Sequence, residues 1–296
     1  EIRLSLVGSE MCIRDRFQTA SRGIASGRRI NEVLACEPSI KDGSFNATTS
    51  IKGKIEFKNV TFAYPLTGDK KILDNINLVI KPGETIGILG ETGCGKTSLI
   101  NLIPRFYDVC EGSVLVDDID VREYNLKNLR ERISVALQKS EIFQSTIKEN
   151  IQWGRENATN NDIANAASIA QAMEFISTST DGFDTLVTQQ GTSLSGGQKQ
   201  RIAISRTILK QSEIIIFDDA TSALDLKTEA SLYSMLKNAY PDTTKIIIAQ
   251  RIASVKDADR IVILDDGHIS AVGTHEELLK NSAIYQDIYN SQLNKK

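Results

Sequence analysis

A glycine-rich segment that ends in lysine and threonine is the feature of this sequence that most clearly predicts chemistry. Residues 90–97 read GETGCGKT and fit the pattern GxxxxGK followed by Ser or Thr. Glycines at these positions let backbone N–H groups surround phosphate oxygens at the N-terminus of a helix. Lys96 is expected to meet the β- and γ-phosphates of a nucleotide, and the Thr97 hydroxyl is the type of oxygen ligand that Mg²⁺ prefers.

The elements around this segment favour a nucleotide site over the alternative, a plain glycine-rich turn. Residues 85–89 (TIGIL) read as a strand, and residues 97–103 (TSLINLI) read as a helix that Pro104 limits. A strand that enters the loop and a helix that leaves it are the context that phosphate binding requires. The predicted nucleotide-binding residues of this segment are Gly90, Glu91, Thr92, Gly93, Cys94, Gly95, Lys96, Thr97 and Ser98.

An aspartate at the end of a second apolar strand is the expected metal-side partner of Thr97. Residues 214–219 read IIIFDD, and this run is apolar on both faces, as a central strand covered by helices must be. Asp218 ends the strand, where a carboxylate that binds magnesium would lie. Many strands end in aspartate before a turn, so this assignment depends on the pairing of Asp218 with the Lys96 segment.

Length and composition place the chain among ordinary globular proteins. Its 296 residues allow one large domain or two modest ones, and 41% of them are hydrophobic. The 35 Lys and Arg residues balance 38 Asp and Glu residues, so nothing favours sequence-independent nucleic-acid binding. The four cysteines lack CxxC spacing, which favours reduced thiols over disulfides or zinc. No apolar run reaches the roughly 18 residues that a membrane helix needs.

The patterns along the chain predict an α/β fold with two additions. Short strands before residue 90 indicate an antiparallel portion, and an Ala-, Asn- and Ile-rich stretch over about 136–200 indicates a helical insert. Strand patterns return at residues 214–219, 245–250 and 260–273, where Asp266-Gly267 suits a tight hairpin turn.

The first 50 residues are expected to lie outside this domain. Residues 1–16 are expected to form no periodic element. They resemble the translation of sequencing-adapter read-through and are excluded from the fold, the alternative being a disordered native terminus. Residues 17–34 read as a basic helix, Pro38 ends it, and residues 43–50 read as a polar linker. The expected divisions are therefore 1–16, 17–50 and 51–296.

Residues 194–198 read LSGGQ and precede a helix with the periodicity of a buried element. With the segment at 90–97, this motif makes the chain resemble the nucleotide-binding domain of ABC transporters over about residues 50–290. Three smaller matches fit in order and spacing. Tyr64 matches the aromatic residue that stacks on adenine, Gln138 the glutamine between the lobes, and residues 222–225 (SALD) the loop after the magnesium aspartate.

The resemblance implies a P-loop NTPase of ABC type, with a RecA-like core, an antiparallel β-subdomain and a helical subdomain. It implies ATP and Mg²⁺ as ligands, with Gln138 assigned both to the metal and to catalysis. In the family two such domains pair head to tail. Each ATP then lies between the phosphate-binding loop (P-loop, here residues 90–97) of one domain and the LSGGQ signature (here residues 194–198) of the other. The residues that would reach the partner's ATP are Ser195, Gly196, Gly197 and Gln198.

Two positions depart from the family pattern at the same chemical step. Asp219 stands where the family has the glutamate that polarises the attacking water, and its shorter side chain puts the contact of about 2.6–3.2 Å in doubt. Gln250 stands in place of the switch-loop histidine, and an amide has no titratable proton near neutral pH. Gln189 and Gln190 also replace an acidic-basic pair common in exporters.

These departures resemble the weakly hydrolytic subunit of heterodimeric ABC exporters, whose intact signature would complete the partner's site. The flanking sequences also resemble exporters: residues 17–34 look like the continuation of a last transmembrane helix, with a membrane half missing before it. The resemblance implies a place at the cytoplasmic face of the cell membrane. The alternatives are a competent homodimeric exporter half, a soluble non-transport ABC ATPase and a regulatory ATP-holding module.

Overall fold

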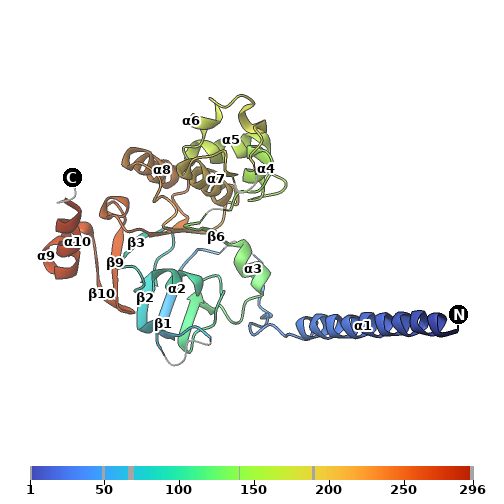
Figure 1. Cartoon of the computed structure of the whole chain (residues 1–296). Helices are drawn as coiled ribbons and strands as arrows, with labels where there is room; N and C mark the ends of the chain where they lie inside the picture. Colours follow the sequence, from blue (N-terminus) through green and yellow to red (C-terminus); the bar gives the residue numbers. More distant parts are fainter. Residues whose placement is uncertain (1, 49–50, 66–69, 140, 189–190, 294–296) are drawn as a thin grey trace. The chain divides into compact units, whose positions relative to one another are not determined.

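The structure is a computed structural model that describes residues 2–48, 51–65, 70–139, 141–188 and 191–293, without the side chains of residues 2–14. The chain forms two compact units, residues 1–41 and 42–296, which are described separately. Figure 1 labels their helices and strands.

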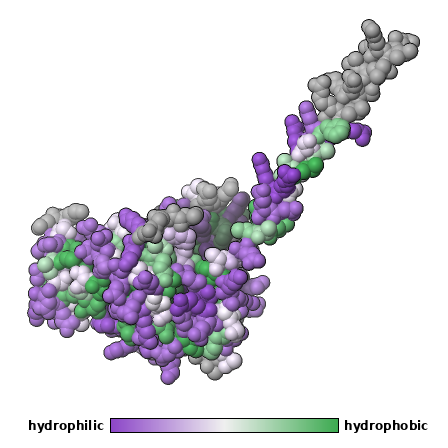
Figure 2. Space-filling view, turned by 90° about the horizontal axis from the view of Figure 1, so that it is seen from below, coloured by the Kyte–Doolittle hydropathy of each residue, from purple (hydrophilic) through white to green (hydrophobic). Residues whose placement is uncertain are grey.

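The first unit is built on one helix, α1 (Ile2–Leu34). The helix predicted for residues 17–34 is present, but it begins upstream, so the expectation that residues 1–16 form no regular element is wrong. The large apolar side chains described on it, within residues 15–34, are exposed, including Phe17 (71%) and Leu34 (77%), and Figure 2 shows hydrophilic and hydrophobic residues along this part of the helix. Among the described residues no helix combines the length and the apolar character needed to cross a membrane.

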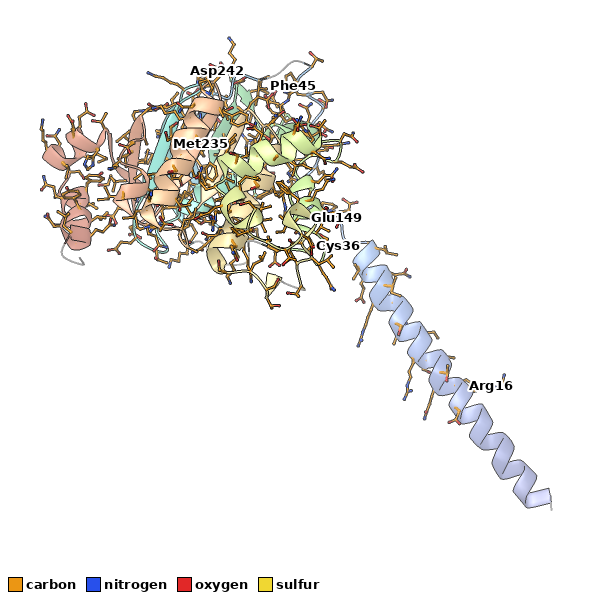
Figure 3. The ribbon with its side chains drawn as sticks, turned by 90° about the horizontal axis from the view of Figure 1, so that it is seen from above. Arg16, Cys36, Phe45, Glu149, Met235 and Asp242 are labelled. Atoms are coloured by element: carbon orange, nitrogen blue, oxygen red, sulfur yellow. The ribbon has the colours of Figure 1, made fainter. Side chains whose placement is uncertain are left out.

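The second unit begins earlier than residue 51, because part of the predicted linker packs on the domain. The Phe45 ring, labelled in Figure 3, lies edge-on to Tyr124 with ring centres 5.0 Å apart. The Asp42 carboxylate accepts hydrogen bonds from the backbone N–H of Leu126 and from the side-chain amide of Asn125. These contacts place the division between the units after Lys41 rather than near residue 50.

A small antiparallel sheet forms the front of this unit. It contains β1 (Ile55–Phe62), β2 (Leu73–Ile80), β4 (Glu111–Val116) and β5 (Ile119–Asp120), in the order β2-β1-β4-β5. The imperfect alternation of β1 has a local cause: the register shifts between Phe57 and Val60, and Asn59 adopts a left-handed φ of 47°. The bulge keeps both Phe57 and Val60 in the core.

The larger sheet carries the predicted nucleotide strands. It contains β3 (Thr85–Leu89), β6 (Ile133–Ala136), β7 (Ile214–Asp218), β8 (Thr244–Ile248), β9 (Arg260–Asp265) and β10 (His268–Gly273). The order is β10-β9-β3-β8-β7-β6, and every pair is parallel except β9 with β10. Asp266 and Gly267 make the predicted hairpin turn, both with positive φ.

The two faces of β7 supply two separate cores, which explains its continuous apolar run. Ile214 and Ile216 join a core with the antiparallel sheet and α2 (Lys96–Asn101), whereas Ile215 and Phe217 join a core with the helical lobe. Each isoleucine buried in this way stabilises the fold by roughly 1.5–3 kcal/mol. The predicted α/β fold, with its antiparallel and helical additions, is confirmed.

The helical lobe lies between β6 and β7 in the chain. It contains α4 (Ile147–Gln152), α5 (Asn160–Ile169), α6 (Met173–Ile176), η1 (Gly182–Asp184) and α7 (Gly196–Leu209). Capping boxes at Thr146 and Thr159 define the starts of α4 and α5, since each hydroxyl accepts the N–H three residues on. Figure 3 labels Glu149, the acidic member of the α4 box.

The remaining helices lie beside the sheets or at the end of the chain. They are α3 (Leu126–Glu131), α8 (Leu226–Ala239), η3 (Ile252–Ser254), α9 (His275–Asn281) and α10 (Ala283–Leu293). Buried Tyr285 holds α10 against the domain, and its hydroxyl lies 2.6 Å from Nδ1 of His275.

Candidate functional site

The loop between β3 and α2 has the backbone that the glycine pattern predicts. Gly95 has φ of 104°, and a Cβ there would lie 2.8 Å from Leu73 Cδ2, so a larger residue would both strain the backbone and clash. Lys96 opens α2 and donates from Nζ to the carbonyl oxygens of Gly90 and Glu91, each at 2.7 Å. The ammonium group therefore lies over the loop, at the start of the helix.

Thr97 and Asp218, which are distant in sequence, meet at the carboxyl edge of the large sheet. The Thr97 hydroxyl lies 3.1 Å and 3.0 Å from the two carboxylate oxygens of Asp218. Asp218 ends β7 and is only 6% exposed. Burial raises the pKa of Asp218, and the nearby Asp219 adds to the rise, while the hydrogen bond from Thr97 opposes it.

This hydroxyl and carboxylate fit a magnesium ion. In nucleotide sites Mg²⁺ is held by one or two carboxylates together with phosphate oxygens rather than by a full protein cage. The described residues contain no group of three His, Cys, Asp or Glu side chains that could hold a metal ion.

One carboxylate oxygen of Asp219 accepts hydrogen bonds from two side-chain amides. Gln138 donates from Nε2 to Oδ2 of Asp219 at 3.0 Å, and Gln250 donates to the same atom at 2.9 Å. The Asp219 backbone has φ of 50°, and its N–H donates to the carbonyl of Ile248 at 3.0 Å. Burial raises the pKa of Asp219, while the hydrogen bond from Gln250 lowers it. The three residues therefore form one cluster beside the Lys96 loop.

A cavity of about 330 Å³ joins these groups. Its volume is at the lower end of the range for small-molecule sites, about 300–1,000 Å³. Its lining includes most of the predicted residues: Tyr64, Thr92, Gly93, Gly95, Lys96, Thr97, Ser98, Gln138, Asp218, Asp219 and Gln250. Ile72 and Ile248 also line it, and no sequence pattern pointed to Ile72 beyond its place before a strand.

Tyr64 lies at the aromatic edge of this cavity. Its hydroxyl is 2.8 Å from Oγ of Ser98, and its ring lies edge-on to Phe62 and Tyr107. Cys94, by contrast, is buried beneath the loop, and burial raises the pKa of its thiol. Cys94 therefore acts in packing at a variable position of the loop.

The LSGGQ segment forms the start of a different helix. Ser195 is the N-cap of α7: its hydroxyl accepts the N–H of Gln198, and the Gln198 side chain accepts the N–H of Ser195. Ser195 and Gly196 are exposed, and none of the residues 195–198 is among those lining the cavity at Lys96. The chain thus presents the cavity and, apart from it, an exposed helix N-terminus.

Three contacts near the site were not foreseen from the sequence. Buried Gln200 on α7 donates to Ser222 Oγ at 3.0 Å and accepts the N–H of Ala223 at 2.9 Å, which ties the signature helix to the loop after Asp219. Arg251, next to Gln250, pairs with the buried carboxylate of Glu229 at 3.3 Å. Such contacts join distant elements through single side chains, so no local pattern reports them.

Gln189 and Gln190, predicted as a departure from the exporter pattern, lie outside the described residues.

Comparisons with known proteins agree with this geometry. The family described as ABC transporter matches residues 73–222. A lipid A-core flippase of Desulfotalea psychrophila, named as ATP-dependent, is 42% identical over 275 residues, which cover 93% of this chain and 48% of that protein. An uncharacterized ABC transporter ATP-binding protein of Bacillus subtilis, YfiB, is 43% identical over 92% of this chain and 47% of its own length.

Among solved structures, a bacterial Atm1-family ABC exporter with ATP bound superposes with a TM-score of 0.88 at 32% identity. The match covers 93% of this chain and 48% of that one. The chain spans about half the length of the curated relatives that it matches.

Proposed function

The chain belongs to the ABC transporter family, and from this membership we propose that it is the ATP-binding domain of an exporter. It binds ATP and Mg²⁺ at an interface with a second ATP-binding domain and couples ATP binding and hydrolysis to export. The observation that carries this proposal is the meeting of Lys96, Thr97, Asp218 and Asp219 around one cavity while Ser195 caps a helix elsewhere on the surface.

Different residues in and around the cavity bind different parts of the ATP molecule. The backbone N–H groups of residues 91–95 and the Lys96 ammonium bind the β- and γ-phosphates, and the Tyr64 ring stacks on the adenine. Thr97, Asp218 and Gln138 would hold a magnesium ion, which would supply positive charge that offsets the phosphate charge. Each of these roles matches the type of group that lines the cavity.

Asp219 is the proposed base of the hydrolysis step. A water molecule attacks the γ-phosphorus as the bond to the β-phosphate oxygen breaks, which yields ADP and inorganic phosphate, and the proton of the water passes to Asp219. Gln138 and Gln250 orient the carboxylate through neutral N–H groups. Because Gln250 carries no positive charge, it stabilises the charge that develops at the γ-phosphate less than an imidazolium would.

We therefore propose that this site hydrolyses ATP slowly and that the chain works beside a non-identical partner. Its own P-loop site mainly holds ATP, while its Ser195 helix completes the site of a partner that carries glutamate and histidine at the two altered positions. Residues 17–34 then continue a last transmembrane helix of the same protein on the cytoplasmic side. The arginines of that segment suit this side of a membrane, and residues 1–16 are proposed to be non-native.

Export as the direction of transport rests on the relatives. The protein of Desulfotalea psychrophila is named a flippase and the superposed structure an exporter. We place the domain at the cytoplasmic face of the cell membrane, with its own membrane half as one partner.

Equilibrium binding of a fluorescent ATP analogue with Mg²⁺ tests the nucleotide site. The variant Lys96→Ala should lose binding, because it removes the ammonium group of the loop. The control is Lys127→Ala, since Lys127 is a surface lysine whose side chain is 86% exposed. Equal binding by both variants would contradict the proposed site.

A further inference from the structure

Gln292 lies on the last helix of the described chain, and its side chain makes two hydrogen bonds to the backbone of the loop that carries Gln250. Its Nε2 donates to the carbonyl oxygen of Gln250 at 2.8 Å, and its Oε1 accepts the N–H of Ile252 at 2.9 Å. The side-chain amide of Gln292 thus supplies hydrogen-bond partners for two backbone groups of the loop, the Gln250 carbonyl and the Ile252 N–H. No motif in the sequence pointed to Gln292.

The helix that carries Gln292 is anchored independently of this loop. Tyr285 is fully buried, and Ile288 and Tyr289 pack against the hydrophobic core that β7 shares with the helical lobe. Positions 285, 288, 289 and 292 lie on one face of α10, because residues three, four and seven apart align along a helix. The packing of Tyr285 therefore sets the position from which Gln292 reaches the loop.

The opposite side of the loop is held by Arg251. Its guanidinium donates to the carbonyl oxygens of Thr221 and Leu224 at 3.1 Å and 3.3 Å, and it pairs with buried Glu229. The peptide of Gln250 is consequently held between α10 on one side and the loop after Asp219 on the other. Gln250 itself is exposed, so these bonds restrict its backbone where core packing does not.

We infer that Gln292 is a positioning residue for the hydrolysis step: it fixes the backbone of Gln250 so that the Gln250 amide stays within reach of Asp219. The C-terminal helix thereby becomes part of the machinery that orients the catalytic carboxylate. This inference rests on the proposed function, because it gives Asp219 and Gln250 their roles. It adds a distant residue that does not itself line the cavity and that contacts the lining residue Gln250 only at its backbone carbonyl.

The test compares three variants of the full chain: Gln292→Ala, Gln292→Glu and the control Gln286→Ala. Gln286 lies on the same helix, and its amide donates to the Leu279 carbonyl at 2.7 Å rather than to the loop. Hydrogen–deuterium exchange without nucleotide should speed up at Ile252 by about fivefold in Gln292→Ala, which loses both hydrogen bonds. Gln292→Glu keeps the acceptor for the Ile252 N–H and should retain most of that protection.

Kinetics separate positioning from general packing. In Gln292→Ala, kcat for ATP should fall about two- to fivefold while KM stays within about twofold, because the residues proposed to hold ATP and magnesium lie outside this loop. Gln286→Ala should change neither value. Unchanged exchange at Ile252 in Gln292→Ala, or an equal change in both alanine variants, would overturn the inference. Absence of ATP turnover in the unsubstituted chain would instead contradict the proposed function, since the exchange measurement needs no nucleotide.

Discussion

Gln250 donates a hydrogen bond of 2.9 Å to Oδ2 of Asp219, the same oxygen that Gln138 reaches at 3.0 Å. Two neutral amides therefore orient the carboxylate that is proposed to activate water. An amide can hold a carboxylate in place, but it adds no positive charge and no titratable proton. This arrangement suits a site that keeps ATP bound for longer than a site with an imidazole would.

Restoring the family residues should speed up hydrolysis. The double variant Asp219→Glu with Gln250→His lengthens the base and supplies an imidazole, so we expect ATP turnover to rise by about tenfold or more. Asp219→Asn, which removes the base, is the matched loss-of-function control. If the double variant turns over ATP no faster than the unsubstituted chain, the two departures are not the cause of a slow site.

The Thr97 hydroxyl should matter for magnesium rather than for the fold. Thr97→Val keeps the shape of the side chain but removes the oxygen, and we expect the Mg²⁺-dependent gain in ATP affinity to fall by at least about tenfold. Thr97→Ser keeps the oxygen and should retain most of the gain. Titration of ATP with and without EDTA measures the effect, and an equal response of the two variants would argue against the proposed metal site.

The raised pKa of Asp218 predicts how stability depends on pH. Because burial raises this pKa above 3.8, the folded chain binds the proton more tightly than the unfolded chain does. Its contribution to stability is therefore present at low pH, declines as pH rises above 3.8 and is gone above the raised pKa. Asp218→Asn should raise the melting temperature at pH 7 by roughly a few degrees and give no gain near pH 3.

Asp225 provides the control of opposite sign for this experiment. Its hydrogen bonds from Thr228 hold its pKa below the ordinary value, so its ionised form favours the fold above pH 3.8. Asp225→Asn should therefore give no increase in melting temperature at pH 7. A similar response of the two variants would contradict the assigned electrostatics.

Ser195 should have separable roles in the fold and in pairing. Ser195→Ala removes the N-cap of α7 and should cost about 1 kcal/mol of stability. Ser195→Asp keeps a capping oxygen but places a negative charge where a partner's phosphate would bind. It should therefore keep the melting temperature and lose ATP-dependent association, measured by light scattering. Association that survives in Ser195→Asp would argue against a role of this helix at a partner's ATP.

The nucleotide loop and its metal-side partner could be predicted because their signals are local. The Lys96 segment has a fixed pattern, and parallel strands bring the ends of β3 and β7 to one edge of the sheet, where Thr97 meets Asp218. The bulge at Asn59 was less accessible, since only the imperfect alternation of β1 hinted at it.

The side-chain contacts around Asp219 could not be read in the same way. The family resemblance supplied Gln138 and Gln250, but not their meeting on one carboxylate oxygen. Gln200 and Gln292 gave no signal, because each joins a helix to a distant loop backbone through one amide. The start of α1 was also misjudged, since residues 2–16 show no clear periodicity and yet continue the helix.

The central claim is that this chain binds ATP in its own cavity, while the N-terminus of α7, capped by Ser195, completes the ATP site of a partner domain. The most direct test is ATP turnover by the chain alone and mixed with an ABC domain that carries glutamate and histidine at the positions of Asp219 and Gln250. We predict slow turnover alone and a marked gain in the mixture, which Ser195→Asp in this chain abolishes. Fast turnover by the chain alone, or a gain that Ser195→Asp leaves intact, would contradict the claim.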